Sequence, residues 1–142
     1  MRIKSAIAIL MMLAPAAFGA TVVASNAWVR APAPGGDIAS AYLTLQSDSN
    51  DQLTGVDASG FGMAMLHESK MENGIEKMTD LDVIALPAQQ TITLAPNGKH
   101  LMLMDFAHPP HVGGTVTLTL HFAHAPDVKI AAPVRPIGAT AP

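Results

Sequence analysis

The feature that most constrains the fold is a period-two alternation of apolar and polar residues in short segments. It is clearest at residues 115–122 (TVTLTLHF), where every second position from Val116 to Phe122 is apolar. Because successive side chains of a strand point to opposite faces, this pattern is typical of a strand with one buried face. Beyond the first twenty residues, no segment shows a sustained helical period.

Comparable segments recur along the chain between clusters of turn-forming residues. We expect strands at residues 22–30, 38–46, 52–58, 63–67, 81–86, 91–94, 100–106, 115–122 and 128–134. Asn97 and Gly98 are a hairpin signal between two of these strands, whereas residues 68–80 are expected to form a polar loop. The sequence therefore predicts an all-β protein, a Greek-key β-sandwich or barrel.

The first twenty residues have the layout of a secretory signal peptide. Arg2 and Lys4 precede an apolar run at residues 6–13, and small residues follow it. The run is too short to span a bilayer, so we expect export and no membrane span after cleavage. Cleavage after Gly19, Ala20 or Ala24 is left open by the sequence.

The expected organisation has three parts. They are a signal peptide at residues 1–20, a β domain at residues 21–135 and a short flexible tail at residues 136–142.

Charge and composition exclude several functions. The formal net charge is −3, and the loss of Arg2 and Lys4 would change it to −5. Such a domain has no basic surface for nucleic acid and no basic amphipathic helix for a membrane. The chain has no cysteine, so it is neither a disulfide scaffold nor a thiol oxidoreductase. It also lacks the thiolate that a blue-copper centre requires.

Methionine occurs beside charged residues, turn residues and histidine in the segments HESKMENGIEKM (67–78) and HLMLM (100–104). By strand parity, His100, Met102 and Met104 share one face, while the leucines between them share the other. An ordinary exposed face would carry Thr, Lys or Glu instead.

The same parity groups Met63, Met65 and His67 on another expected strand. Thioether sulfur is soft and uncharged and imidazole is borderline, so the pair suits Cu(I) better than Zn, Mg or Ca. Neutral ligands leave the charge of Cu(I) uncompensated, which favours a shallow surface site. The patterning therefore predicts a Cu(I) site, although a structural role for these methionines remains the alternative.

The spacing of four of these residues resembles a family signature. His67, Met78, His100 and Met102 are separated by ten, twenty-one and one residues. This H-x10-M-x21-H-x-M pattern is similar to that of the periplasmic copper chaperones called PCuAC. The blocks NAWVRAPAP, AYLTL, LHESKMENGIEKM, GKHLMLMDF and GGTVTLTLHF resemble that family in order, over essentially the whole chain after residue 20.

The resemblance implies a cupredoxin-like β-barrel that binds one Cu(I) through His67, Met78, His100 and Met102. It implies a periplasmic carrier that passes copper by ligand exchange to an acceptor protein. That acceptor would be a cytochrome c oxidase subunit, at the copper A centre, or another copper chaperone, in oxidase assembly or copper tolerance. Many relatives have a Met- and His-rich tail, which this chain lacks in RPIGATAP.

Other residues receive secondary interpretations. Met71 and Met104 are candidate auxiliary ligands, Met63 and Met65 are expected to surround the site, and Trp28 is expected to pack in the core. The remaining histidines are interpreted as solvated, with a secondary Cu(II) or Zn site as the alternative: His108, His111, His121 and His124.

Two other classes of function are weighed against copper transfer. An exported β-sandwich could use a Met-rich face to dock a partner protein without metal, because exposed apolar patches commonly mark interfaces. That function would not require His67 and His100. The chain has no G-x-S-x-G nucleophile motif, and we do not expect an enzyme.

Overall fold

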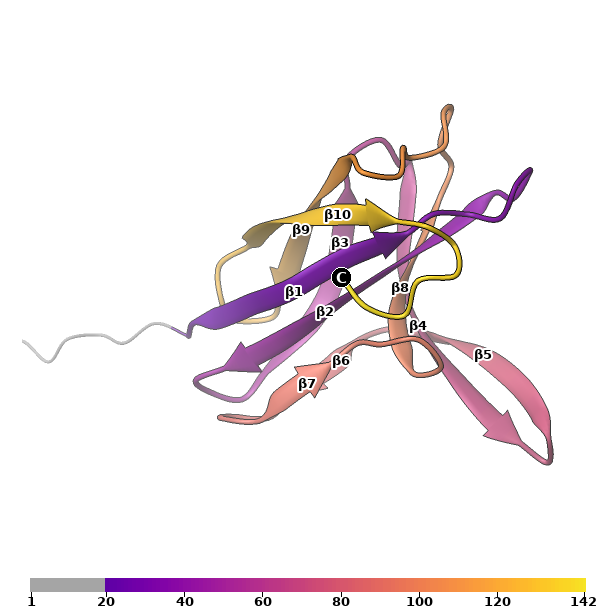
Figure 1. The fold of residues 1–142 in the computed structure, drawn as a ribbon. Helices are drawn as coiled ribbons and strands as arrows, with labels where there is room; N and C mark the ends of the chain where they lie inside the picture. The colour runs from indigo at the N-terminus through magenta and orange to yellow at the C-terminus, as the bar shows by residue number, and fades with distance from the viewer. Residues whose placement is uncertain (1–19) are drawn as a thin grey trace, which may run out of the picture.

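The computed structural model describes residues 20–142, so the predicted signal peptide lies outside the described residues except for Ala20. Ten strands form the fold (Figure 1). They are β1 (Val22–Arg30), β2 (Ile38–Ser47), β3 (Asp51–Ala58), β4 (Met63–Glu72), β5 (Ile75–Leu81), β6 (Ile84–Leu86), β7 (Thr91–Thr93), β8 (Lys99–Met104), β9 (Thr115–Phe122) and β10 (Val128–Arg135). The described chain contains no helix, and hence none with the length and apolar character needed to cross a membrane. The all-β prediction is confirmed.

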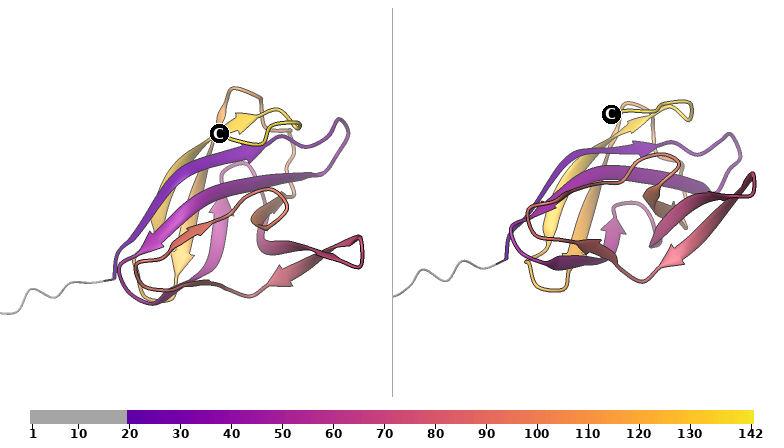
Figure 2. Two further views of the ribbon diagram at one scale, coloured as in Figure 1. Left: turned by 60° about the horizontal axis from the view of Figure 1, so that its bottom comes forward. Right: turned by 90° about the horizontal axis from the view of Figure 1, so that it is seen from below.

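The strands form two layers, and one pair of hydrogen-bonded strands connects the two. One layer has the order β5-β4-β8-β2-β1, with β7 also paired to β2, and the other has the order β10-β9-β3-β6. The parallel pairing of β1 with β10 joins them, and all other neighbours are antiparallel. Figure 2 shows the two layers from other directions.

The core between the layers is built from the alternate residues that the sequence pattern predicts. Its most deeply buried side chains include Val29, Leu43, Leu45, Leu53, Leu101, Leu103, Leu118 and Leu120. Burying one such side chain stabilises the fold by about 1.5–3 kcal/mol. In β8, Leu101 and Leu103 therefore turn the intervening residues of that strand to the outside.

A β-bulge in β1 determines which face Trp28 occupies. The register with β2 shifts between Ser25 and Trp28, and Asn26 has a φ of 52°. The extra residue reverses the alternation, so that Val29 faces the core and Trp28 faces outward. Trp28 is buried, but on the outer face of the sheet rather than in the core between the layers. The predicted burial of Trp28 is therefore confirmed, and the bulge places its ring on the outer face.

The predicted loop at residues 68–80 is instead a long hairpin of β4 and β5. Its two-residue turn is Asn73 and Gly74, with φ of 51° and 76°, which is the left-handed conformation that a tight hairpin requires. The charged residues of this segment hid the strand pattern because both faces of β5 are exposed, so no apolar alternation is needed.

The predicted hairpin at Asn97 and Gly98 was also wrong. Strands β7 and β8 do not pair with each other; both pair with β2, at successive positions along it. The turn between them, closed by a hydrogen bond from the Gly98 N–H to the Ala95 carbonyl, carries the chain along one edge of β2.

The C-terminal residues fold back over the outer face of the β1–β2 sheet (Figure 1). The guanidinium of Arg30 donates two hydrogen bonds to the Ala139 carbonyl, from Nη2 at 2.7 Å and from Nε at 3.1 Å. The same guanidinium lies over the rings of Trp28 and Tyr42.

Replacement of a core leucine in β8 should test the division between the two faces. We expect Leu103→Ala to lower the free energy of unfolding by about 2–5 kcal/mol, because it leaves a cavity at a fully buried site. The exposed Ile75→Ala should change it by less than about 0.5 kcal/mol. Urea unfolding of both variants measures this, and equal losses would contradict the assignment of the core.

Candidate metal site

Three cross-strand pairs on the outer face of β4 and β8 carry the soft donors. His67 lies opposite His100, Met65 opposite Met102, and Met63 opposite Met104. Residues that pair across an antiparallel ladder project on the same face. Side-chain alternation therefore sets the His and Met residues of each strand on one face, as predicted. The register of β4 and β8 places the two sets opposite each other.

The hairpin partner β5 brings Met78 to the same face. Met78 pairs with Ser69 and Asp80 pairs with His67. Met78 thus lies diagonally from His67, a separation of about 7–8 Å that long side chains can bridge. Met102 lies on the other side of the histidine pair, two residues along β8 from His100. The structure therefore places all four residues of the signature around one point of the sheet.

Both imidazoles are held in a fixed and buried position. His67 is only 6% exposed and His100 only 4%, and the centroids of their rings are 5.8 Å apart. The Met78 residue is 62% exposed, so the thioether side of the site is open to solvent. The site thus combines rigid nitrogen donors with an accessible sulfur donor.

The hydrogen bonding of His100 leaves one nitrogen available as a ligand. Its Nδ1 lies 3.0 Å from the Gly98 carbonyl oxygen. A carbonyl can only accept, so the proton is on Nδ1 and Nε2 keeps its lone pair. Burial lowers the pKa of His100, the neighbouring His67 lowers it further, and the bond to Gly98 opposes both. The ring is therefore kept neutral, which is the form that binds metal.

His67 has unsatisfied nitrogens. Its Nε2 lies 2.6 Å from the Asp80 Oδ1, the distance of an ion pair, but neither ring nitrogen has a partner with hydrogen-bond geometry. The Asp80 side chain is 72% exposed, whereas that of His67 is only 7% exposed. A buried imidazole without a hydrogen bond is costly unless a ligand satisfies it.

An aromatic and cationic group borders the histidines on the β2 side. The rings of Tyr42 and His100 are 6.4 Å apart, and those of Tyr42 and Trp28 are 4.6 Å apart. These side chains, with Arg30 over both aromatic rings, cover the flank of the site. Sequence reasoning missed Tyr42, whose approach depends on the pairing of β2 with β8. It also missed Asp80, which the Asn73-Gly74 hairpin signal could have placed opposite His67.

The structure orders the remaining methionines by their distance from the histidine pair. Met65 is two residues from His67 on β4. Met71 is four residues from His67 and Met104 is four residues from His100, which is about 13 Å along a strand. Met65, which the sequence assigned to the surroundings, is thus nearer than either of the two predicted auxiliary ligands.

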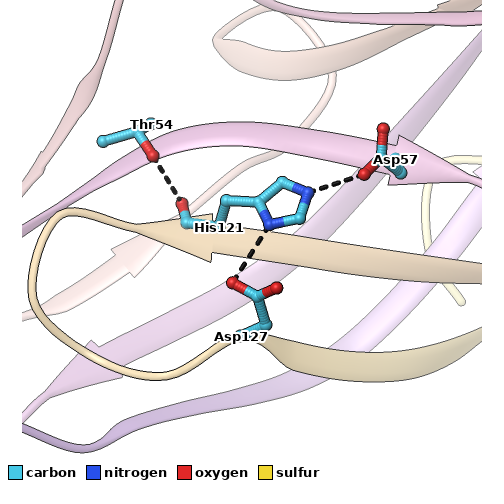
Figure 3. A network of polar contacts seen from close by, with 4 residues as sticks. All are labelled: Thr54, Asp57, His121 and Asp127. Atoms are coloured by element: carbon cyan, nitrogen blue, oxygen red, sulfur yellow. Dashed lines mark hydrogen bonds and ion pairs between the residues drawn. The ribbon is translucent and has the colours of Figure 1, made fainter.

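The other histidines lie elsewhere. His108 and His111 line a cavity of about 200 Å³ together with Phe61 and Pro110. His121 on β9 is held by two carboxylates, with Nε2 at 2.6 Å from Asp57 and Nδ1 at 3.0 Å from Asp127 (Figure 3).

Both nitrogens of His121 are thus already occupied. Across residues 20–142, no three or more His, Cys, Asp and Glu side chains are grouped to hold a metal ion.

The His121 cluster predicts a pH-dependent contribution to stability. The hydrogen bond to Asp57, and then that to Asp127, raise the pKa of His121 above its ordinary value of 6.5. The contribution is therefore complete below that value and is lost as the pH rises through the raised pKa. We expect His121→Asn to destabilise the protein more at about pH 5.5 than at about pH 8.5, by less than about 1 kcal/mol because the ring is partly exposed.

Urea unfolding of this variant and the wild type at both pH values measures the difference. His108→Asn, which changes the same residue type in an exposed loop, is the control. A loss of stability that is the same at both pH values, or larger at the higher one, would contradict the prediction.

Fold and site together define a class: a small β-sandwich domain with histidine and methionine donors on one outer face. The chain matches the family described as "Putative lipoprotein LpqE-like" over residues 22–134, and it belongs to that family. A relative from Leifsonia xyli subsp. xyli (strain CTCB07), "Putative lipoprotein Lxx21020", is 31% identical over 115 residues, which cover 80% of this chain and 69% of the relative.

Solved structures show the same fold. The copper-bound PCuAC domain from PmoF2 superimposes with a TM-score of 0.68 and 30% identity, covering 81% of this chain and 92% of that domain. The solution structure of Cu(I)-DR1885 from Deinococcus radiodurans superimposes with a TM-score of 0.55 and 31% identity, covering 78% and 77% of the two chains. These similarities confirm the PCuAC resemblance and the cupredoxin-like fold.

Proposed function

We propose that this protein is an exported copper chaperone that binds one Cu(I) on the outer face of β4, β8 and β5. The observation that carries the proposal is the cross-strand pair of His67 and His100, both buried: the ring nitrogens of His67 lack hydrogen-bond partners, and the bond from His100 Nδ1 to the Gly98 carbonyl leaves its Nε2 available. Met78 and Met102 complete the proposed ligand set. Similarity to the copper-bound domain of PmoF2 and to Cu(I)-DR1885 supports this choice of metal.

The donor set is suited to Cu(I) rather than to harder cations. Two neutral imidazoles and two thioethers are soft or borderline ligands, and no carboxylate is needed. Asp80 is the nearest carboxylate, and it contacts His67 rather than standing among the proposed ligands. Its negative charge would partly offset the charge of the bound ion.

The uneven exposure of the ligands supports transfer by ligand exchange. The buried histidines keep their positions, whereas the exposed Met78 can leave the ion when an incoming ligand replaces it. The copper ion would then pass to an acceptor protein without release into solution. This function needs no catalytic group, and we propose a carrier rather than an enzyme.

The proposed location and acceptor follow from the family resemblance. The layout of residues 1–20 and the lipoprotein descriptions of the relatives support export, and we propose the periplasm as the compartment. An acceptor such as the copper A centre of cytochrome c oxidase, or another copper chaperone, is consistent with a Cu(I) carrier. A second copper site in the tail is not proposed, because residues 136–142 contain no His or Met.

Anaerobic titration with Cu(I) against a colorimetric chelator tests the proposal. We expect residues 20–142 to bind one equivalent tightly. We expect His100→Ala/Met102→Ala to weaken binding at least about a hundredfold, since loss of supporting residues alone costs about 10- to 100-fold in metal affinity.

The matched control is His108→Ala/Met63→Ala, which removes the same residue types away from the proposed ligands and should bind Cu(I) as the wild type does. Equal weakening by both variants, or no competition by the wild type with even a weak chelator, would overturn the copper proposal. The Met-rich face would then be assigned to docking of a partner protein without metal.

A further inference from the structure

The strand beside the proposed copper site is an open edge of the sheet. Within the described residues, β5 stands at the end of the strand order and pairs only with β4. Residues 75–80 of β5 are exposed on both faces of the strand. Figures 1 and 2 show the β4–β5 hairpin projecting from the body of the sandwich. An exposed edge is a ready template for another strand.

The hairpin geometry determines which backbone groups face that edge. In a two-residue loop, the flanking residues, here Glu72 and Ile75, form a hydrogen-bonded pair, and such pairs alternate with non-hydrogen-bonded ones along the ladder. Glu76, Met78 and Asp80 fall at the non-hydrogen-bonded positions. Their N–H and C=O groups therefore point away from β4, toward the open edge.

The same three residues direct their side chains to the copper-binding face. Met78 shares a face with His67 because it pairs with Ser69, and Asp80 pairs with His67 directly. A strand that hydrogen-bonds to the backbone of Met78 would place the Cβ atom of its own opposing residue about 5 Å from the Cβ atom of Met78. Edge pairing would thus bring an incoming ligand to the most exposed of the proposed copper ligands.

The charges along this face indicate what kind of strand fits. Glu76 forms no ion pair within the described residues, and Asp80 has its only ionic contact with His67. The cations of the hairpin lie on the opposite face, where Lys70 pairs with Glu68 and Lys77 pairs with Glu72. The copper-binding face of β5 therefore presents a thioether between two carboxylates.

This charge pattern opposes pairing of β5 with a second copy of itself. In the antiparallel register that sets Met78 opposite Met78, Glu76 would face Asp80 twice, and like charges directly opposite are destabilising. A strand with basic residues two positions before and after a central Met or His would be complementary to the same three positions.

We propose that β5 is the docking edge for the copper acceptor, which adds an extended strand with a Met or His flanked by Lys or Arg at alternate positions. This inference rests on the proposed function and deepens it by naming the surface and the chemistry of the partner. Backbone hydrogen bonds provide affinity, and the carboxylates select a basic strand. The opposing Met or His then replaces Met78 on the ion.

The test uses a capped peptide, acetyl-Val-Lys-Thr-Met-Thr-Lys-Val-amide, and the copper-free protein. We expect amide hydrogen exchange, followed by NMR, to slow at Glu76, Met78 and Asp80 when the peptide is added. The amides of Lys77 and Thr79, already bonded to β4, should not change. A control peptide with Glu in place of both Lys should have no effect. Unchanged exchange at the three edge amides with the basic peptide, or equal slowing by both peptides, would overturn the proposal.

Transfer of Cu(I) to the same peptide separates docking from copper binding. Glu76→Pro removes an N–H that β4 does not use, and we expect it to slow transfer about tenfold, the equivalent of one or two lost backbone hydrogen bonds. Its affinity for Cu(I) should match that of Glu76→Ala, which removes the same carboxylate near His100 but keeps the N–H.

Glu76→Ala, which keeps the N–H, should slow transfer by a smaller factor. Equal transfer by Glu76→Pro and the wild type would contradict edge docking, even with copper binding intact. A failure to bind Cu(I) would instead refute the proposed function, while the exchange measurement on the copper-free protein would still decide whether β5 docks a strand.

Discussion

The cross-strand register of β4 and β8 is the constraint on which the site depends, and the hydrophobic core enforces it. His67 lies opposite His100 because Leu66 and Leu101, their neighbours on each strand, are buried on the other face. A slip of one residue would expose these leucines and bury the polar set, because side chains alternate with a period of two. The energy that holds the imidazoles together therefore comes from the core beneath them.

Burial and exposure are divided among the proposed ligands in a way that suits a carrier. The histidines are held by the sheet, by the Gly98 carbonyl and by the rings of Tyr42 and Trp28, so they keep their geometry without metal. Met78 stands on a projecting hairpin with little packing around it. A buried pair of imidazoles beside an exposed, soft sulfur would allow both retention and exchange of a Cu(I) ion.

Much of the architecture follows from local pattern, and the failures have identifiable causes. Alternation located nine strands, since each of them has one face in the core. It missed β5, whose two exposed faces require no apolar residue, and it did not show the bulge at Asn26, which turns the buried Trp28 to the outer face. The hairpin signal at Asn97 failed because β7 and β8 both pair with β2. Only in this last case did pairing with another strand override a local signal.

The sequence by itself determined the all-β class, the faces shared by His and Met, and the spacing of His67, Met78, His100 and Met102. These depend on side-chain alternation within single strands, which is a local property of the backbone. Only the tertiary structure decided that His67 meets His100, that Met65 lies nearer than Met71 or Met104, and that Asp80 and Tyr42 border the site. The contacts among β2, β4 and β8 join strands that are distant in sequence, and the shared burial of the core selects their register.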